Sequence, residues 1–249
     1  MIATSPNLRV FRCTTNDSPI AKRYSMPKSE TFFWNAYARV YDQLLRTIPY
    51  QRLLKKTLDH LPIGAARLLD AGCGTGSLLN AARARHPALA LHGIDFSAAM
   101  LSLAHKKVAE AVLTVGDLNA PLPFPSDSFD VVTCINVLHA VSDPGRTLVE
   151  LNRVLKRGGA LIVSSPSSHA RIAPLVCEHA AVVGWSRTLP TLASVALLVL
   201  FNLLIVRRGR SRGNRFLASE SVRHFLPGGE LELAYANQNW FLCSTKEDL

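Results

Sequence analysis

An aspartate and three glycines form the segment of this chain that is best suited to chemistry. Asp70 is followed by Gly72, Gly74 and Gly76, with two leucines before the acid and a helical pattern after the last glycine. This pattern predicts a buried strand, a tight turn and a helix start, where glycines permit positive φ and a close approach to a ligand. Dinucleotide-binding loops read G-x-G-x-x-G, whereas this loop reads G-x-G-x-G after an acid. Since Asp70 would repel a pyrophosphate, we expect a ligand that carries an amine or a sulfonium group.

A second acid, Asp95, ends the next predicted strand, residues 89–95, and lies 19 residues after Gly76. In doubly wound α/β folds, an acid at this place accepts hydrogen bonds from ribose hydroxyls. Ligands of such folds bind outside the carboxyl ends of the strands. Asp95 therefore predicts that the ligand of the glycine loop contains a nucleoside.

The glycine loop and three further segments resemble one enzyme family. Residues 68–76 resemble motif I of the class I S-adenosylmethionine-dependent methyltransferases, whose usual form is h-D-x-G-x-G-x-G. Residues 121–130 and 150–161 resemble segments of the type 11 group, and residues 36–42 resemble the A-x-x-Y-D helix of its ubiquinone/menaquinone-biosynthesis branch. The resemblance covers residues 33 to 165 with few gaps.

The resemblance implies that S-adenosylmethionine is the cofactor and that each contact residue has a defined part. Asp70 would favour the positively charged methionine end, and Asp95 would hold the ribose. Asp117 would accept a hydrogen bond from the adenine amino group. Tyr37 and Tyr41 would lie on a helix that closes over the cofactor, although they could equally pack on the core. The implied contacts are Asp70, Gly72, Gly74, Gly76, Asp95, Phe96, Met100, Asp117, Leu118 (through its backbone amide), Asn136, Tyr37 and Tyr41.

His139 is the candidate catalytic residue that the resemblance implies. It follows the predicted strand 129–135 at its carboxyl end, near the place where a methyl acceptor would bind. An imidazole titrates near neutral pH and could act as a general base. The alternative is that His139 only positions the acceptor.

The remaining pattern predicts a single α/β domain over residues 31–249, preceded by a mobile tail, residues 1–30. Apolar runs alternate with helical patterns, and the chain closes with a helix and two short strands. We expect a Rossmann-like sheet of seven mostly parallel strands with an antiparallel C-terminal hairpin and helices on both faces. The predicted helices are 31–45, 50–61, 78–85, one that Ser97 caps, 144–155 and 219–226, and the predicted strands are 68–70, 89–95, 112–115, 129–135, 160–165, 230–235 and 240–244.

An apolar helical insert with a basic flank, residues 185–215, departs from the minimal family pattern. Residues 189–206 contain no charge, and five arginines follow between residues 207 and 215. Three interpretations are open: a lid over the acceptor, a helix that docks on an anionic membrane surface, and a membrane span. A span would separate the final strands from the rest of the sheet, which argues against it. The first two interpretations both suggest an apolar acceptor.

Composition limits the other function classes. The formal net charge is +10, and the basic cluster adjoins an apolar helix rather than exposed aromatic residues, so no nucleic-acid partner is expected. The five cysteines are scattered and form no C-x-x-C pair, which argues against a zinc or other metal site and against a disulfide framework. Together with the lack of an apolar segment in the first thirty residues, this predicts a cytoplasmic protein, in peripheral contact with a membrane if the insert docks there.

The sequence thus predicts an S-adenosylmethionine-dependent methyltransferase that acts on a small, apolar or lipid-like acceptor. The alternative is a methyltransferase-like module that binds the cofactor and serves as a membrane-associated scaffold. The patterns do not decide between C-, O- and N-methylation, and they leave the oligomeric state open.

Overall fold

Seven strands form one mixed sheet in the computed structural model, which describes residues 36–38, 40–167, 170–211, 219–226 and 228–247. The strand order is β3-β2-β1-β4-β5-β7-β6, and only β7 runs antiparallel to its neighbours, β5 and β6. This arrangement confirms the predicted fold class. The predicted tail, residues 1–30, lies outside the described residues. The strands are β1 (Arg67–Ala71), β2 (Ala90–Asp95), β3 (Val112–Val115), β4 (Phe129–Ile135), β5 (Leu155–Pro166), β6 (Glu230–Ala234) and β7 (Asn239–Thr245).

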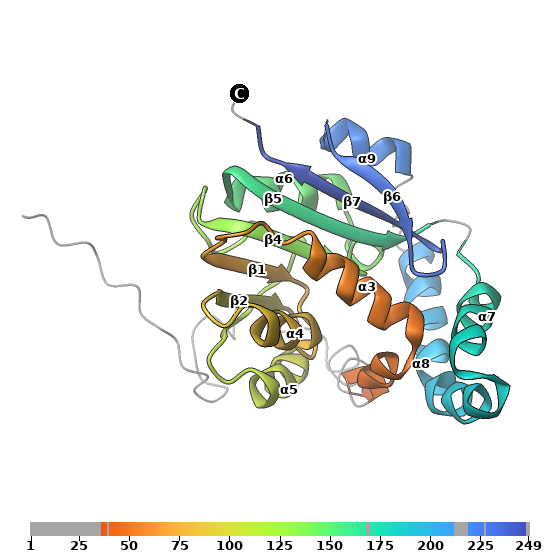
Figure 1. Ribbon diagram of the computed structural model, residues 1–249. Helices are drawn as coiled ribbons and strands as arrows, with labels where there is room; N and C mark the ends of the chain where they lie inside the picture. Colours follow the sequence, from red (N-terminus) through yellow and green to blue (C-terminus); the bar gives the residue numbers. More distant parts are fainter. Residues whose placement is uncertain (1–35, 39, 168–169, 212–218, 227, 248–249) are drawn as a thin grey trace, which may run out of the picture.

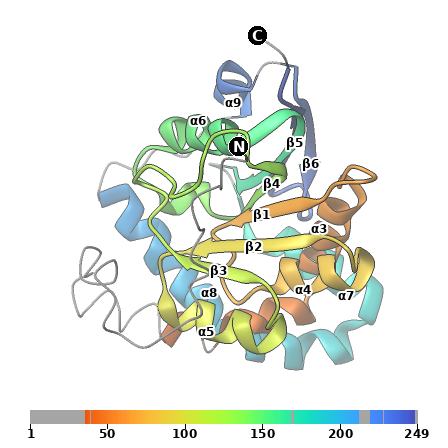
Figure 2. The same ribbon diagram turned by 90° about the vertical axis from the view of Figure 1, so that its left-hand side faces the viewer.

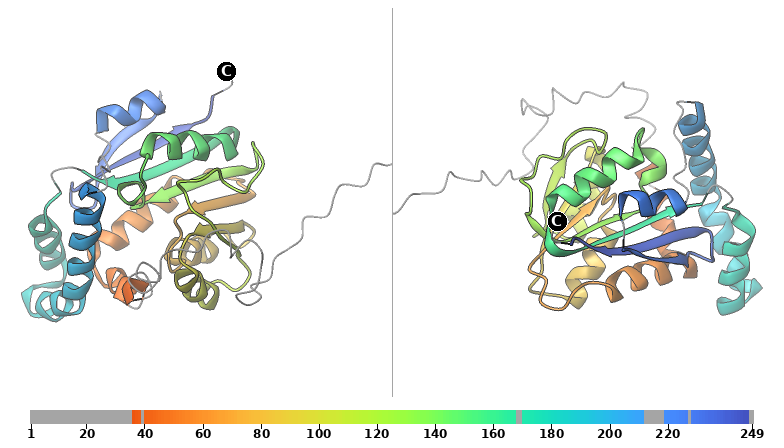
Figure 3. Two further views of the ribbon diagram at one scale, coloured as in Figure 1. Left: turned by 180° about the vertical axis from the view of Figure 1, so that it is seen from behind. Right: turned by 90° about the horizontal axis from the view of Figure 1, so that it is seen from above.

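Helices cover both faces of the sheet (Figure 2). α3, α4 and α5 pack on one face, and α6 and α9 pack on the other. α7 and α8 lie side by side beyond the carboxyl ends of the parallel strands (Figures 1 and 3). The helices are η1 (Asp42–Arg46), α3 (Ile48–Asp59), α4 (Ser77–Arg85), α5 (Ala98–Lys107), η2 (Leu138–Ala140), α6 (Pro144–Val154), α7 (Ile172–Val183), α8 (Trp185–Ser211) and α9 (Ser219–Phe225).

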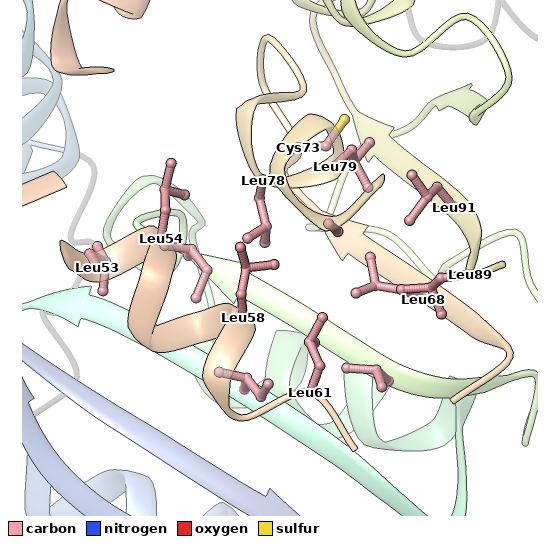
Figure 4. Packing of buried hydrophobic residues seen from close by; sticks show 14 of the residues in the cluster. Leu53, Leu54, Leu58, Leu61, Leu68, Cys73, Leu78, Leu79, Leu89 and Leu91 are labelled. Carbon is pink, nitrogen blue, oxygen red and sulfur yellow. The ribbon is translucent and has the colours of Figure 1, made fainter. Parts of the chain in front are cut away.

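The core is built from strands that are apolar on both faces, as parallel strands between two helix layers must be. Leu68 of β1 faces the α3 side and packs in one buried cluster with Leu54 and Leu58 of α3 (Figure 4). Its neighbour Leu69 faces the opposite layer and packs in a second cluster with Leu148 of α6. Because successive side chains of a strand point to opposite faces, two adjacent leucines anchor both layers and hold the end of β1 in place.

The secondary structure differs from the predictions in three places. α7 was not predicted, because it buries few side chains and shows little amphipathic pattern. β5 begins at Leu155, earlier than the predicted residue 160, because Leu155 pairs with Phe129 of β4. Of the predicted helix 31–45, the described part is α-helical up to Tyr41 and continues as the 3₁₀-helix η1.

Within the described residues, no helix combines the length and apolar character needed to cross a membrane.

Candidate active site

The glycine loop joins β1 to α4 and takes the conformation that its residues predict. Gly72, Gly74 and Gly76 all have positive φ, at 77°, 53° and 74°. A Cβ atom on Gly72 would lie 2.4 Å from the side chain of Val137, and one on Gly76 would lie 2.9 Å from Cβ of Ala104. The loop therefore requires glycine at these positions for both backbone conformation and space.

Asp95 fixes this loop to the end of β2. Its Oδ2 accepts a hydrogen bond from the backbone N–H of Gly74 at 2.9 Å, and its Oδ1 accepts one from Ser97 at 2.9 Å. Ser97 caps α5 as predicted, because its hydroxyl accepts a hydrogen bond from the N–H of Met100 at 3.3 Å. Burial raises the pKa of Asp95 to about 6, against the effect of the two N–H donors. A carboxylate can accept about four hydrogen bonds, so Asp95 keeps acceptor capacity for a ligand.

Asp70 lies at the end of β1, buried to 4% exposure. Its Oδ1 accepts a hydrogen bond from the hydroxyl of Thr133 on the adjacent strand β4 at 2.8 Å. Burial raises the pKa of Asp70 to about 7; the Thr133 donor opposes the shift, and the nearby charge of Asp95 adds to it. Among the described residues neither acid has an ion-pair partner, so this end of the site is a buried, acidic environment without a counter-cation.

Tyrosines from three separate elements gather around Asp70. Tyr41 and Tyr50 each influence the pKa of the other, and Tyr235, in the turn between β6 and β7, raises the pKa of both. Burial holds the pKa values of Tyr41 and Tyr50 well above the usual range of a tyrosine, and the negative charge of Asp70 makes a smaller contribution in the same direction. Burial also raises the pKa of Tyr235 to about 12. All three phenols are therefore neutral hydrogen-bonding groups at physiological pH.

A polar cluster ties the segment that carries Tyr41 to the glycine loop. Oδ1 of Asp42, the first residue of η1, accepts a hydrogen bond from the hydroxyl of Thr75 at 2.6 Å. The same oxygen lies 2.7 Å from Nζ of Lys107 at the end of α5. Lys107 also donates to Thr75 at 2.9 Å and to Ser77 at 3.4 Å. One carboxylate thus joins three elements that surround the loop.

An apolar cluster lies beside this polar one and brings in α8. Tyr37 is buried together with Met100 of α5 and Val195 of α8. The ring of Tyr37 lies 5.4 Å from that of Tyr41 and 5.6 Å from that of Phe201 on α8, measured between centroids. Tyr41 in turn faces the glycine loop, since a Cβ on Gly74 would lie 3.6 Å from its ring. One face of α8 therefore covers the segment that covers the loop.

The loop after β3 supplies the next two predicted residues. Oδ1 of Asp117 accepts hydrogen bonds from the backbone and side chain of Asn119, at 2.9 and 2.8 Å. Asn119 in turn accepts from the N–H and hydroxyl of Ser142, which precedes α6. Leu118 is buried. This chain of hydrogen bonds fixes the loop at the carboxyl edge of the sheet, on the far side of β2 from Asp70.

Asn136 directly follows β4 in a left-handed conformation, with φ of 59°. Its side-chain oxygen accepts a hydrogen bond from Nδ2 of Asn239 at 2.5 Å, and Asn239 also donates to the hydroxyl of Ser164 at 3.0 Å. Asn239 is 1% exposed and begins β7. The antiparallel strand thus holds a residue of the site in a conformation that is uncommon for a side chain other than glycine.

His139 lies in η2, just beyond Asn136 at the same edge. Its Nδ1 is buried and has no hydrogen-bond partner among the described residues. Burial lowers the pKa of His139 to about 4. The predicted base therefore has a pKa well below neutral, because desolvation opposes its charged form, and the imidazole is neutral at physiological pH.

A separate cavity of about 550 Å³ opens between α3, α7 and the β6–β7 turn, and Tyr235 is part of its lining. Its lining includes Arg52 and Glu178, which form an ion pair, and Lys56, which pairs with Glu232. No residue of the glycine loop lines this cavity.

Comparison with known proteins agrees with this geometry. Residues 69–163 match the family model described as "Methyltransferase domain". A phosphatidylethanolamine N-methyltransferase of Cereibacter sphaeroides is 31% identical over 140 residues, which cover 54% of this chain and 67% of that protein. The chain belongs to the class I S-adenosylmethionine-dependent methyltransferases, in the type 11 group.

Other members of this family match over shorter shares of their length. The demethylmenaquinone methyltransferase of Thermotoga maritima is 36% identical over 130 residues, 51% of this chain and 56% of that protein. The chain thus spans little more than half the length of this relative. A solved S-adenosylmethionine-dependent methyltransferase from Thermotoga maritima shares the fold, with a TM-score of 0.58 over 89% of this chain and all of that one, at 20% identity.

The cofactor of this methyltransferase family fits the residues present. S-adenosylmethionine carries a sulfonium and an ammonium group, and the loop is flanked by two carboxylates, Asp70 and Asp95, whose pKa values are raised by burial. A cation beside them would lower those pKa values and favour the ionised forms. Among the described residues, no group of three metal-ligating side chains is placed to hold a metal ion.

Most of the predicted methyltransferase site residues lie at one edge of the sheet, at or just after the ends of β1 to β4. Five further residues that join them were not predicted. Thr133 interrupts the apolar run of β4, and this isolated hydroxyl is a signal that the sequence offers. The other four reach the site from distant elements and carry no local signal. They are Tyr50, Tyr235, Asn239 and Lys107.

Proposed function

We propose that this chain transfers the methyl group of S-adenosylmethionine to a small, apolar or lipid-like acceptor. The observation that carries the proposal is that an acidic environment and an apolar environment lie next to each other at one site. Buried acids flank the glycine loop, and an apolar cluster of Tyr37, Met100 and Val195 covers it. The buried acids suit a cationic methyl donor, and the apolar cluster suits an acceptor with little polarity.

The chain's own residues would act by binding and orientation. Asp70 would stabilise the charged methionine end, and Asp95 would accept hydrogen bonds from the ribose. When bound between these residues, S-adenosylmethionine would supply an activated methyl group, which a nucleophilic atom of the acceptor would take up as the carbon–sulfur bond is broken and sulfur keeps its electron pair. The protein then needs only to align the acceptor and exclude water.

The adenine would be held on the side of β2 that faces away from Asp70, next to the loop after β3. Asp117 is proposed to accept from the adenine amino group, with the amide of Leu118 as a donor and with Met100 and Phe96 as apolar or flanking contacts. Asn119 and Ser142 hold the loop of Asp117 in place, which supports this part of the proposal. Tyr37 and Tyr41 would lie between the cofactor and α8.

The relatives support an apolar acceptor by their names. One is named for demethylmenaquinone and another for phosphatidylethanolamine, and both are lipid-like molecules. The apolar residues of α8 beside Tyr37, which are Leu192, Val195 and Phe201, support the same acceptor class. The charged lining of the separate cavity beside Tyr235 does not suit such a molecule.

A methyl-transfer assay with labelled cofactor tests the proposal. The purified chain is incubated with S-adenosylmethionine labelled in its methyl group and with either the organic or the aqueous fraction of a lipid extract. We expect label in the organic fraction, lost in Asp95→Ala and retained in Asp59→Ala, which changes a surface acid paired with Lys55 and Arg85. Label only in the aqueous fraction would contradict an apolar acceptor. Cofactor binding without label in either fraction would favour the scaffold alternative.

A further inference from the structure

The outer face of α8 carries an apolar stripe that no described part of the chain covers. Leu189, Leu200 and Leu204 are 63%, 52% and 41% exposed. Two exposed alanines, Ala193 and Ala196, lie between them. The spacings of four, three, four and four residues keep all five on one face of a helix, over a length of about 22 Å. We call these five residues the outer stripe.

The inner face of α8 is occupied. Val195 is buried against Tyr37 and Met100, and Phe201 contacts the ring of Tyr37. These residues lie away from the outer stripe around the helix, since Val195 is six positions after Leu189. α8 is therefore apolar on two sides, and only one of them is needed to cover the site.

The turn before α8 extends the exposed apolar surface. Val182 near the end of α7 and Trp185 at the start of α8 are 51% and 59% exposed, and Ile172 at the start of α7 is 46% exposed. Of the twelve large apolar side chains that are exposed in the described part of the chain, six lie on α7 and α8. Such a concentration marks an interaction surface, whereas single exposed apolar residues are normal.

The net charge of α7 and α8 indicates which class of partner this surface binds. Residues 172–211 contain four arginines, Arg187, Arg207, Arg208 and Arg210, and one acid, Glu178, for a net charge of +3. Glu178 is already paired with Arg52 of α3. A second copy of this chain would place the same positive charge against itself. An anionic lipid surface is complementary both to the arginines and to the apolar stripe, and tryptophan is favoured at such an interface.

We propose that the outer stripe of α8, with Val182 and Trp185, docks this protein on an anionic membrane surface. α8 would lie along the interface, with its outer face in the lipid and its inner face on the Tyr37 segment. The two interpretations of the insert, a lid and a membrane-docking helix, would then describe opposite faces of one helix. The inference goes beyond methyl transfer and holds even if the chain transfers no methyl group.

Vesicle co-sedimentation tests the proposal independently of activity. The full chain is mixed with vesicles of phosphatidylcholine alone or with one third phosphatidylglycerol, at 0.1 M and at 0.5 M salt. We expect sedimentation with the anionic vesicles, weakened at high salt as the charges are screened. Leu200→Glu should weaken binding by about tenfold or more, since it removes a leucine that enters the lipid. Ile63→Glu, the same kind of change at a fully exposed apolar residue far from α8 in the sequence, should bind as the wild type does.

Intrinsic fluorescence gives a second readout. Of the tryptophans in the described residues, Trp185 is exposed and Trp240 is buried. We expect a blue shift on adding anionic vesicles, lost in Trp185→Phe. Absence of binding to both vesicle types would overturn the proposal. A second outcome would also overturn it: the wild type binds no vesicles and forms a dimer, and Leu200→Glu separates that dimer. The outer stripe would then be an interface between two copies of the chain.

Discussion

Oδ1 of Asp42 lies 2.7 Å from Nζ of Lys107 and 2.6 Å from the hydroxyl of Thr75. Asp42 follows Tyr41 directly, so the cluster fixes the segment that covers the glycine loop to that loop. Thr75 is fully buried, whereas the side chains of Asp42 and Lys107 are 37% and 23% exposed. The ion pair is thus a link at the rim of the site, anchored on a buried hydroxyl.

We expect Asp42→Asn and Lys107→Met each to weaken S-adenosylmethionine binding by about three- to tenfold, because the covering segment loses a partly buried charged contact. Isothermal titration calorimetry would measure the change. Lys106→Met, at the exposed neighbouring lysine, serves as the matched control. The exchange Asp42→Lys with Lys107→Asp should recover part of the affinity. If both single variants bind as the wild type does, the cluster has no part in closing the site.

Asp95→Ala should weaken S-adenosylmethionine binding by about ten- to a hundredfold, because it removes the proposed ribose contact and also the carboxylate that holds Gly74 and Ser97. Calorimetry measures the affinity, and thermal unfolding without ligand separates the two effects. Asp59→Ala is the control for loss of an acid at the surface. Unchanged affinity in a folded Asp95→Ala variant would refute the ribose assignment.

Asp70 should make the ligand-free protein less stable as the pH rises. Burial raises its pKa from 3.8 to about 7, so between these values the folded state holds a proton that the unfolded state has released. The stabilisation this gives is complete below pH 3.8 and is lost as the pH rises through about 7. His139, with its lowered pKa, acts in the opposite direction below pH 6.5.

The Asp70 contribution is isolated by comparing wild type with Asp70→Asn in thermal unfolding between pH 5 and pH 8. We expect the midpoint of the wild type to fall relative to that of Asp70→Asn across this range. Saturating S-adenosylmethionine should reduce the difference, since a bound cation favours the ionised carboxylate. Parallel pH profiles for the two proteins would show that Asp70 is not protonated near neutrality.

His139→Gln should leave the cofactor affinity unchanged and lower turnover by less than about a hundredfold. A general base contributes about 10²- to 10⁴-fold, but a buried imidazole with a pKa near 4 is a weak base. We therefore expect it to position the acceptor. Single-turnover rates of wild type and variant, measured with the acceptor found in the labelling assay, provide the test. A loss beyond a thousandfold with intact cofactor binding would restore the catalytic role.

The parts of the site that the sequence predicted are those encoded within a short segment. The positions of Gly72, Asp95 and Ser97 follow from a strand, a turn and a helix cap, and each of these has a local pattern. Tyr235 and Asn239 reach the site only because β7 inserts beside β5, and no local spacing contains that information. The pKa of His139 likewise depends on how deeply its ring is buried, which its place after β4 does not determine.

The two faces of the insert could not be distinguished from the sequence for a different physical reason. When a helix buries only one side, its sequence normally shows which side is buried, because apolar residues lie on that face and polar residues lie on the opposite face. α8 is apolar toward Tyr37 and apolar toward the outside, so residues 189–206 show one continuous run. Only the packing of Val195 and the exposure of Leu200 distinguish its two faces.

The hydrogen bond from Asn239 to Asn136 has a consequence for how the protein is made. A chain leaves the ribosome from its N-terminus, so the glycine loop, Asp95 and Asn136 are synthesised well before Asn239. Until β7 inserts between β5 and β6, Asn136 lacks the donor that accompanies its left-handed conformation, and that edge of the sheet stays open. A nascent chain that ends before residue 239 would thus carry every residue of the glycine loop, yet the edge of the sheet beside Asn136 would still be incomplete.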